Sequence, residues 1–166
     1  MVIAASVFAA VHILVSIAAV VAQVQRIGWR SKKIVHLPFI LAIIGILGGA
    51  FFCVLTVMCA MDGQWPFLFF GAMVLVCDCM ITAYLNCVIR YDDQGFLARN
   101  FFGIKRRCKY EEVEGLRSGR DWRVCFKGHS ITIDEKSCGD HDFIAALHRG
   151  YKRATGKRLP VSSKLR

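Results

Sequence analysis

Charged residues are nearly absent from the first 89 residues of this chain. Asp62 and Asp78 are the only acidic residues there, and every lysine or arginine falls between residues 26 and 33. Three long apolar runs fill the rest, at about residues 1–24, 36–61 and 65–89. A helix needs roughly 20 mostly apolar residues to cross a bilayer, and the runs lack the alternation of barrel strands. The pattern predicts three transmembrane helices.

The usual catalytic motifs are also missing. The sequence has no glycine-rich phosphate loop, no Gly-x-Ser-x-Gly elbow and no redox Cys-x-x-Cys pair. We therefore expect a protein that is not an enzyme and binds no cofactor.

Cysteine is plentiful, but neither predicted external segment offers a disulfide pair. Five of the eight cysteines fall within the apolar runs, where cysteine behaves as a small apolar residue. The pattern Cys125, His129, Cys138 and His141 contains zinc-type ligands, but its spacing matches no standard zinc finger. Ordinary packing without a bound metal is the expectation.

Loop charge predicts the orientation. The link from Arg26 to Lys33 carries four positive charges, whereas the link around Asp62 carries one negative charge. Because lysine and arginine stay on the cytoplasmic side, the N-terminus is expected outside and residues 90–166 on the cytoplasmic side of the membrane. The first run has no basic residues before it and is long, which favours a retained helix over a cleaved signal peptide.

The C-terminal part is strongly basic. Residues 90–166 hold 18 Lys/Arg against 10 Asp/Glu. Such a surface is attracted to anionic lipid head groups by about 1 kcal/mol for each well-placed side chain. A tethered domain meets lipid first, so no nucleic-acid partner is expected.

Two of the apolar runs carry polar residues at helical spacing. In the first run they are His12, Ser16 and Gln23, and in the third Asp78, Thr82 and Asn86. Offsets of 4, 8 and 11 stay on one helix face. Since both runs cross in the same direction, His12 and Asp78 are expected to lie at similar depth. The pair either fixes helix packing or lines a proton or cation path.

The second run contains small residues instead. Gly45 and Gly49 form a Gly-x-x-x-Gly motif with Gly48 beside it. Small residues at this spacing allow helices to approach closely. The motif fits packing within one chain or a contact between subunits.

Residues 90–156 predict a small α + β domain. Strand-like segments occur at 87–91, 96–102, 107–111 with 113–117, 122–126 and 130–134. A helix is expected to begin after Asp140, with Asp140 as its N-cap, one apolar stripe and an end at Gly156. Residues 157–166 are expected to form a flexible basic tail.

Three segments of this domain resemble those of a known protein family: Tyr91-Asp-Asp-Gln-Gly-Phe96, Asn100-Phe-Phe-Gly103 and Tyr110-Glu-Glu-Val-Glu-Gly-Leu116. With the strand order and the final helix, the domain resembles the bacterial pleckstrin-homology-like domains attached to small membrane proteins. The resemblance implies a curved, partly open barrel of seven strands that a helix closes at one end. The strand count falls short of seven here, which fits a truncated sheet or one completed by a second copy.

The resemblance also implies a binding or scaffolding module. Phosphoinositide-binding members carry basic residues on the first hairpin, where this chain has Asp92 and Asp93. The basic cluster follows on the next turn, at Lys105, Arg106, Arg107 and Lys109. It fits a solvated face, contact with anionic lipid, or an unknown protein partner.

Besides an accessory subunit of a transporter or of a membrane stress system, two functional hypotheses remain. The first is a membrane protein, expected to be a homo-oligomer, whose cytoplasmic pleckstrin-homology-like domain serves binding, scaffolding or self-assembly. The alternative is a homo-oligomeric ion or proton channel with a His12–Asp78 path that the domain gates.

Overall fold

A computed structural model describes residues 1–28 and 33–163. Arg30 and Lys32 of the predicted basic link lie outside the described residues. The chain divides into two compact units. One comprises residues 1–30 and 38–85, and the other residues 31–37 and 86–166.

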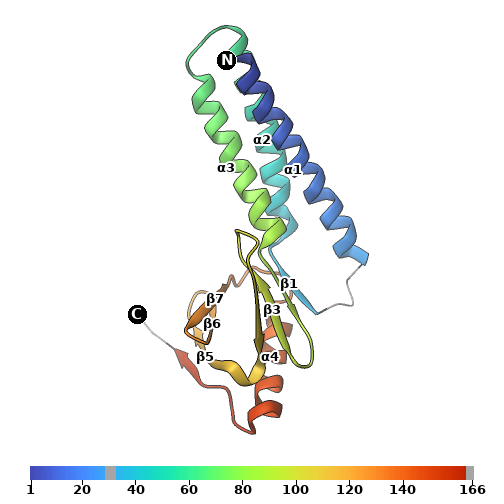
Figure 1. The fold of residues 1–166 in the computed structure, drawn as a ribbon, viewed down its shortest axis with the longest axis vertical. Helices are drawn as coiled ribbons and strands as arrows, with labels where there is room; N and C mark the ends of the chain where they lie inside the picture. Colours follow the sequence, from blue (N-terminus) through green and yellow to red (C-terminus); the bar gives the residue numbers. More distant parts are fainter. Residues whose placement is uncertain (29–32, 164–166) are drawn as a thin grey trace. The chain divides into compact units, whose positions relative to one another are not determined.

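The first unit is a helical bundle. Within the described residues, three helices are long and apolar enough to cross a membrane: α1 (Val2–Gly28), α2 (Phe39–Met61) and α3 (Phe67–Asn86). They lie side by side, with α1 and α3 running in one direction and α2 in the other (Figure 1). Many of their large apolar side chains face outward, among them Ile3, Leu14, Leu47, Phe51 and Leu68. Such a surface suits hydrocarbon rather than water.

Glycines set how closely these helices pack. A β-carbon at Gly45 would lie 2.7 Å from Ile81 Cγ1 and 3.0 Å from the Cys77 carbonyl oxygen of α3. One at Gly49 would overlap the His12 ring of α1. Gly45 therefore packs against α3 and Gly49 packs against α1 of the same chain. Both glycines are buried.

The second unit begins with a strand that the sequence did not reveal. Strand β1 (Ile34–His36) lies between α1 and α2 in the sequence and pairs antiparallel with β2 (Val88–Tyr91). The second apolar run was expected to be helical from residue 36, but its helix begins at Phe39. Pro38 explains the difference: the residue before a proline favours extended backbone, and proline itself suits a helix start.

Two four-stranded sheets form the body of this unit. The first has the order β1-β2-β3-β4, with β3 at Gly95–Arg99 and β4 at Lys105–Lys109. The 3-10 helix η1 (Tyr110–Glu112) leads into the second sheet, of order β7-β6-β5-β8. Its strands are β5 (Val113–Ser118), β6 (Trp122–Phe126), β7 (His129–Ile133) and β8 (Val161–Ser163).

Part of the expected tail belongs to the sheet. Strand β8 pairs parallel with β5, so residues 161–163 are not the flexible segment that composition indicated. Leu159, just before it, is buried in the core. The apolar side chain of Leu159, within a basic tail, was the sequence feature that could have predicted this strand pairing.

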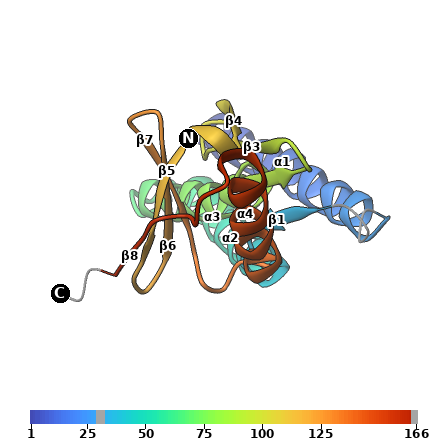
Figure 2. The same cartoon turned by 90° about the horizontal axis from the view of Figure 1, so that it is seen from below.

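Helix α4 (Asp140–Thr155) completes the core. Phe143, Ile144 and Leu147 pack with residues of both sheets, and Gly156 ends the helix in a left-handed conformation at φ +71°. Figure 2 shows α4 beside the first sheet. Acidic residues in its first turn and basic residues in its last complement the helix dipole.

Candidate functional site

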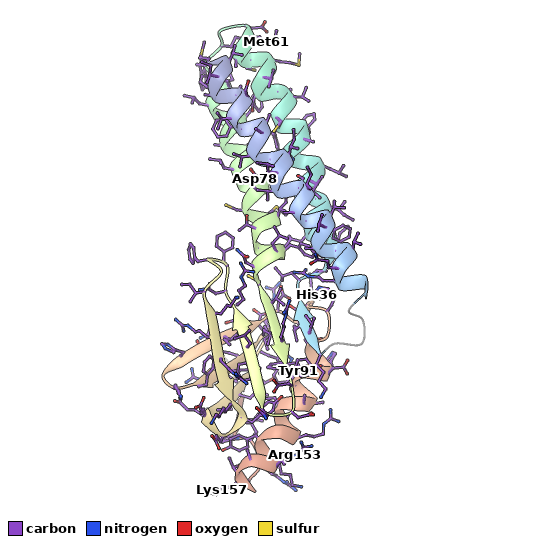
Figure 3. The ribbon with its side chains drawn as sticks, turned by 45° about the vertical axis from the view of Figure 1, so that its right-hand side comes forward. His36, Met61, Asp78, Tyr91, Arg153 and Lys157 are labelled. Carbon is purple, nitrogen blue, oxygen red and sulfur yellow. The ribbon has the colours of Figure 1, made fainter. Side chains whose placement is uncertain are left out.

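The helical unit contains a buried histidine–aspartate couple, formed by His12 and Asp78. His12 Nδ1 of α1 lies 2.7 Å from Asp78 Oδ1 of α3, and His12 and Asp78 are 4% and 7% exposed. Asp78 sits halfway along α3 (Figure 3). His12 Nε2 donates to the Ile46 carbonyl oxygen of α2 at 3.2 Å. One imidazole thus joins all three helices.

The geometry fixes the number of protons in this couple. The Ile46 carbonyl only accepts, so His12 Nε2 carries a hydrogen. A second proton lies between Nδ1 and Oδ1, because two bare acceptors would repel at 2.7 Å. The couple is neutral overall whichever atom holds that proton, as an apolar environment requires. Asp78 Oδ2 is buried and has no hydrogen-bond partner among the described residues.

The other polar residues of the predicted stripe divide into separate groups. Ser16 Oγ lies 3.5 Å from His12 Nε2. Gln23 instead accepts a hydrogen bond of 2.5 Å from the Tyr84 hydroxyl, and Asn86 donates to the Phe101 carbonyl oxygen at 2.8 Å. Thr82 is half-buried. Ala19 and Ile81, which follow Ser16 and Asp78 by three residues, have no exposed surface. Apolar packing thus interrupts the stripe.

Tyr84 and Arg26 form a second cluster that the sequence analysis missed. Arg26 Nη2 donates to the carbonyl oxygens of Tyr84 and Leu85 at 3.1 and 3.4 Å, and its guanidinium carbon lies 4.3 Å from the Tyr84 ring centroid. A cation at the last carbonyls of α3 is favoured by the helix dipole and by the aromatic face. The sequence feature that could have predicted this cluster was Arg26 itself, a charged residue one helical turn after Gln23.

The acidic first hairpin has a structural explanation. Asp92 Oδ1 accepts the backbone N–H groups of Gln94 and Gly95 at 2.8 and 2.9 Å and so closes the turn. Asp93 pairs with Lys33 at 2.8 Å, just before β1. The Lys33 ammonium holds the pKa of the Asp93 carboxyl below its usual value. Both carboxylates therefore take part in interactions that stabilise the hairpin.

The basic cluster lies on an edge strand, whereas the sequence pattern placed it on a turn. β4 is the last strand of its sheet, and Lys105, Arg106 and Arg107 are exposed with no ion pair among the described residues. Lys109 differs, because its ammonium lies 3.6 Å from Glu111. Charges on an edge strand oppose pairing with another chain, and here they also place three exposed cations in a row.

A cavity opens between the two sheets. It measures about 530 Å³, within the range of small-molecule sites. The residues that line the cavity include five apolar ones: Val35, Ile89, Ala98, Ile131 and Ile133. Arg99, Arg106, Asp121 and Asp134 supply charges of both signs around it. The cavity can accept an amphiphilic molecule.

The structure does not bring together the residues of the predicted metal pattern. Across residues 1–28 and 33–163, no three His, Cys, Asp or Glu side chains gather as metal ligands, and Cys125, His129, Cys138 and His141 form no such group. Burial raises the pKa of the Cys108 thiol to about 12, which keeps it protonated.

Comparison with protein-family models, with curated proteins and with solved structures finds no match.

Proposed function

We propose that this chain is a multi-pass bacterial membrane protein that holds a small binding domain at the cytoplasmic face. The pairing of β1 with β2 carries the proposal. β1 precedes α2 by two residues, Leu37 and Pro38, and β2 follows α3 by one, Cys87. If the helices span the bilayer, the start of α2 and the end of α3 must emerge on the same side. Lys33 and Arg26 mark that side as cytoplasmic.

The strand arrangement supports a pleckstrin-homology-like domain. With β1 included, seven antiparallel strands in two sheets precede the C-terminal helix α4 within the described residues. Strand β1, which lies in the α1–α2 link, brings the number of antiparallel strands among the described residues to seven. Neither a truncated sheet nor a second copy of the chain is then needed to explain the strand count. The cavity between the sheets is the binding site we assign to this domain, and Lys105, Arg106 and Arg107 face anionic lipid or a protein partner.

The interrupted polar stripe favours this function over a channel. Buried Ala19 and Ile81 separate the His12–Asp78 couple from the Gln23–Tyr84 group, so the described part of one chain offers no continuous polar route. A neutral couple that joins three helices is what a packing role needs. Conduction would require further copies of the chain.

Sided labelling tests the proposal. Cys138 is exposed in the domain, and Gln64 is exposed in the turn between α2 and α3. A membrane-impermeant maleimide should label Cys138 in inside-out vesicles and a Gln64→Cys variant in intact cells, as read by peptide mass spectrometry. Labelling of Cys138 from outside would overturn the orientation, and recovery of the chain without membranes would overturn the whole proposal.

A further inference from the structure

The β3–β4 hairpin ends in an exposed apolar loop, residues 100–104. Phe102 is 81% exposed and Ile104 is 54% exposed. Exposed large apolar side chains in a water-facing domain mark contact surfaces when they lie together. Cations flank the loop on both sides: Arg99 precedes it, and Lys105 and Arg106 follow it, all of them exposed.

The loop has a defined conformation. The Asn100 side chain accepts the Ile104 N–H at 2.9 Å, and the Gly103 N–H donates to the Asn100 carbonyl at 2.9 Å. Gly103 adopts a φ of +79°, which glycine accommodates without strain. The Phe101 and Phe102 rings contact edge to face, with centroids 5.3 Å apart. Phe102 is therefore held outward by a folded turn rather than left there by disorder.

A hydrogen bond ties this loop to the end of α3. Asn86, the last residue of α3, donates from Nδ2 to the Phe101 carbonyl oxygen at 2.8 Å. A helix of 20 residues with few charges is long enough to span the hydrocarbon region. Its last residue then lies at the head groups, and the bond holds Phe101 at that depth. Phenylalanine and other apolar side chains of interfacial segments enter the head-group boundary, and lysine and arginine meet anionic head groups there.

We infer that the 100–104 loop is a lipid-binding wedge, in which Phe102 and Ile104 enter the bilayer interface and Arg99, Lys105 and Arg106 contact lipid phosphates. The inference deepens the proposed function, because it depends on α3 crossing the membrane. It assigns the basic residues next to the loop to lipid rather than to a protein partner. It also explains why apolar side chains stand among these cations.

A photo-crosslinking experiment on the full chain tests this inference. Benzoylphenylalanine, which is close to phenylalanine in shape, replaces Phe102 in chains reconstituted into nanodiscs of phosphatidylglycerol and phosphatidylcholine. The matched control carries it at Gln94, an exposed residue at the opposite end of β3. Illumination should attach lipid to at least fivefold more of the Phe102 chains than of the Gln94 chains, as read by intact mass.

A third chain, with benzoylphenylalanine at Leu75, distinguishes failure of the wedge from failure of the membrane anchor. Leu75 is 48% exposed on α3 and reports whether that helix meets lipid. Lipid adducts at 75, with no more at 102 than at 94, would overturn the wedge and leave the membrane anchor standing. No lipid adduct at any position would overturn the proposed function as well. Crosslinked dimers at 102 in place of lipid adducts would assign the loop to a second copy of the chain and overturn the wedge.

Discussion

The imidazole of His12 occupies the space that a β-carbon on Gly49 would fill. The absence of a side chain at Gly49 of α2 therefore allows α1 to place His12 against Asp78 of α3. A glycine motif and a buried couple, which are separate features in the sequence, form one packing arrangement.

Substitution of this glycine should disrupt the bundle. In Gly49→Ala the added methyl group must displace the His12 ring from its bonds to Asp78 and Ile46, and overpacking of this kind typically destabilises by about 1–3 kcal/mol. Gly48→Ala is the matched control, because its β-carbon meets only Cys77 Sγ, at 3.3 Å. Denaturant titration in detergent micelles should show a clear loss for Gly49→Ala and a smaller one for Gly48→Ala. Equal losses would contradict the role given to His12.

The His12–Asp78 couple should contribute to stability and not to conduction. Hydrogen bonds between membrane helices are worth about 0.6 kcal/mol on average and up to about 1.7 kcal/mol. A double-mutant cycle with His12→Gln and Asp78→Asn should return a coupling energy in that range. Proteoliposomes of the native chain and of Asp78→Asn should show the same low proton flux. Native flux that Asp78→Asn abolishes would instead support the channel.

The sequence predicted the elements whose patterns are local. The three helices lie within a few residues of their expected ranges, and β6 and its turn at Lys127–Gly128 follow from alternation and a glycine. β1 was missed because three residues at the edge of an apolar run show no period, and its partner β2 lies more than 50 residues away. The Tyr84–Gln23 bond was missed for a similar reason, since the rotation of α1 against α3 depends on packing across the bundle.

Tyr110 should make the domain sensitive to alkaline pH. Its hydroxyl donates to the Asp92 carbonyl at 2.7 Å, and burial raises its pKa from 10.0 to about 12. Between these values the unfolded chain loses this proton and the folded chain keeps it, so stability falls as pH rises from 10 to 12. Tyr110→Phe should lose about 1 kcal/mol at pH 8, where the hydrogen bond is missing. Its melting temperature should then fall less steeply above pH 10, and an unchanged slope would count against a buried phenol.

A disulfide can test the strand on which the proposed function depends. Ile34 and Arg90 are register partners in β1 and β2, and the Tyr91 N–H bonds the Lys33 carbonyl at 3.0 Å. The neighbouring pair 34/90 is therefore not hydrogen-bonded, which brings its Cα atoms to about 4.5 Å, within disulfide range. Ile34→Cys with Arg90→Cys should oxidise readily in the full chain reconstituted in lipid, as peptide mass spectrometry would show. Ile34→Cys with Lys105→Cys, which places the second thiol on β4, should not. A bond in the control but not in the 34/90 pair would remove β1 from the sheet, and with it the reason to place both helix ends on one side of the membrane.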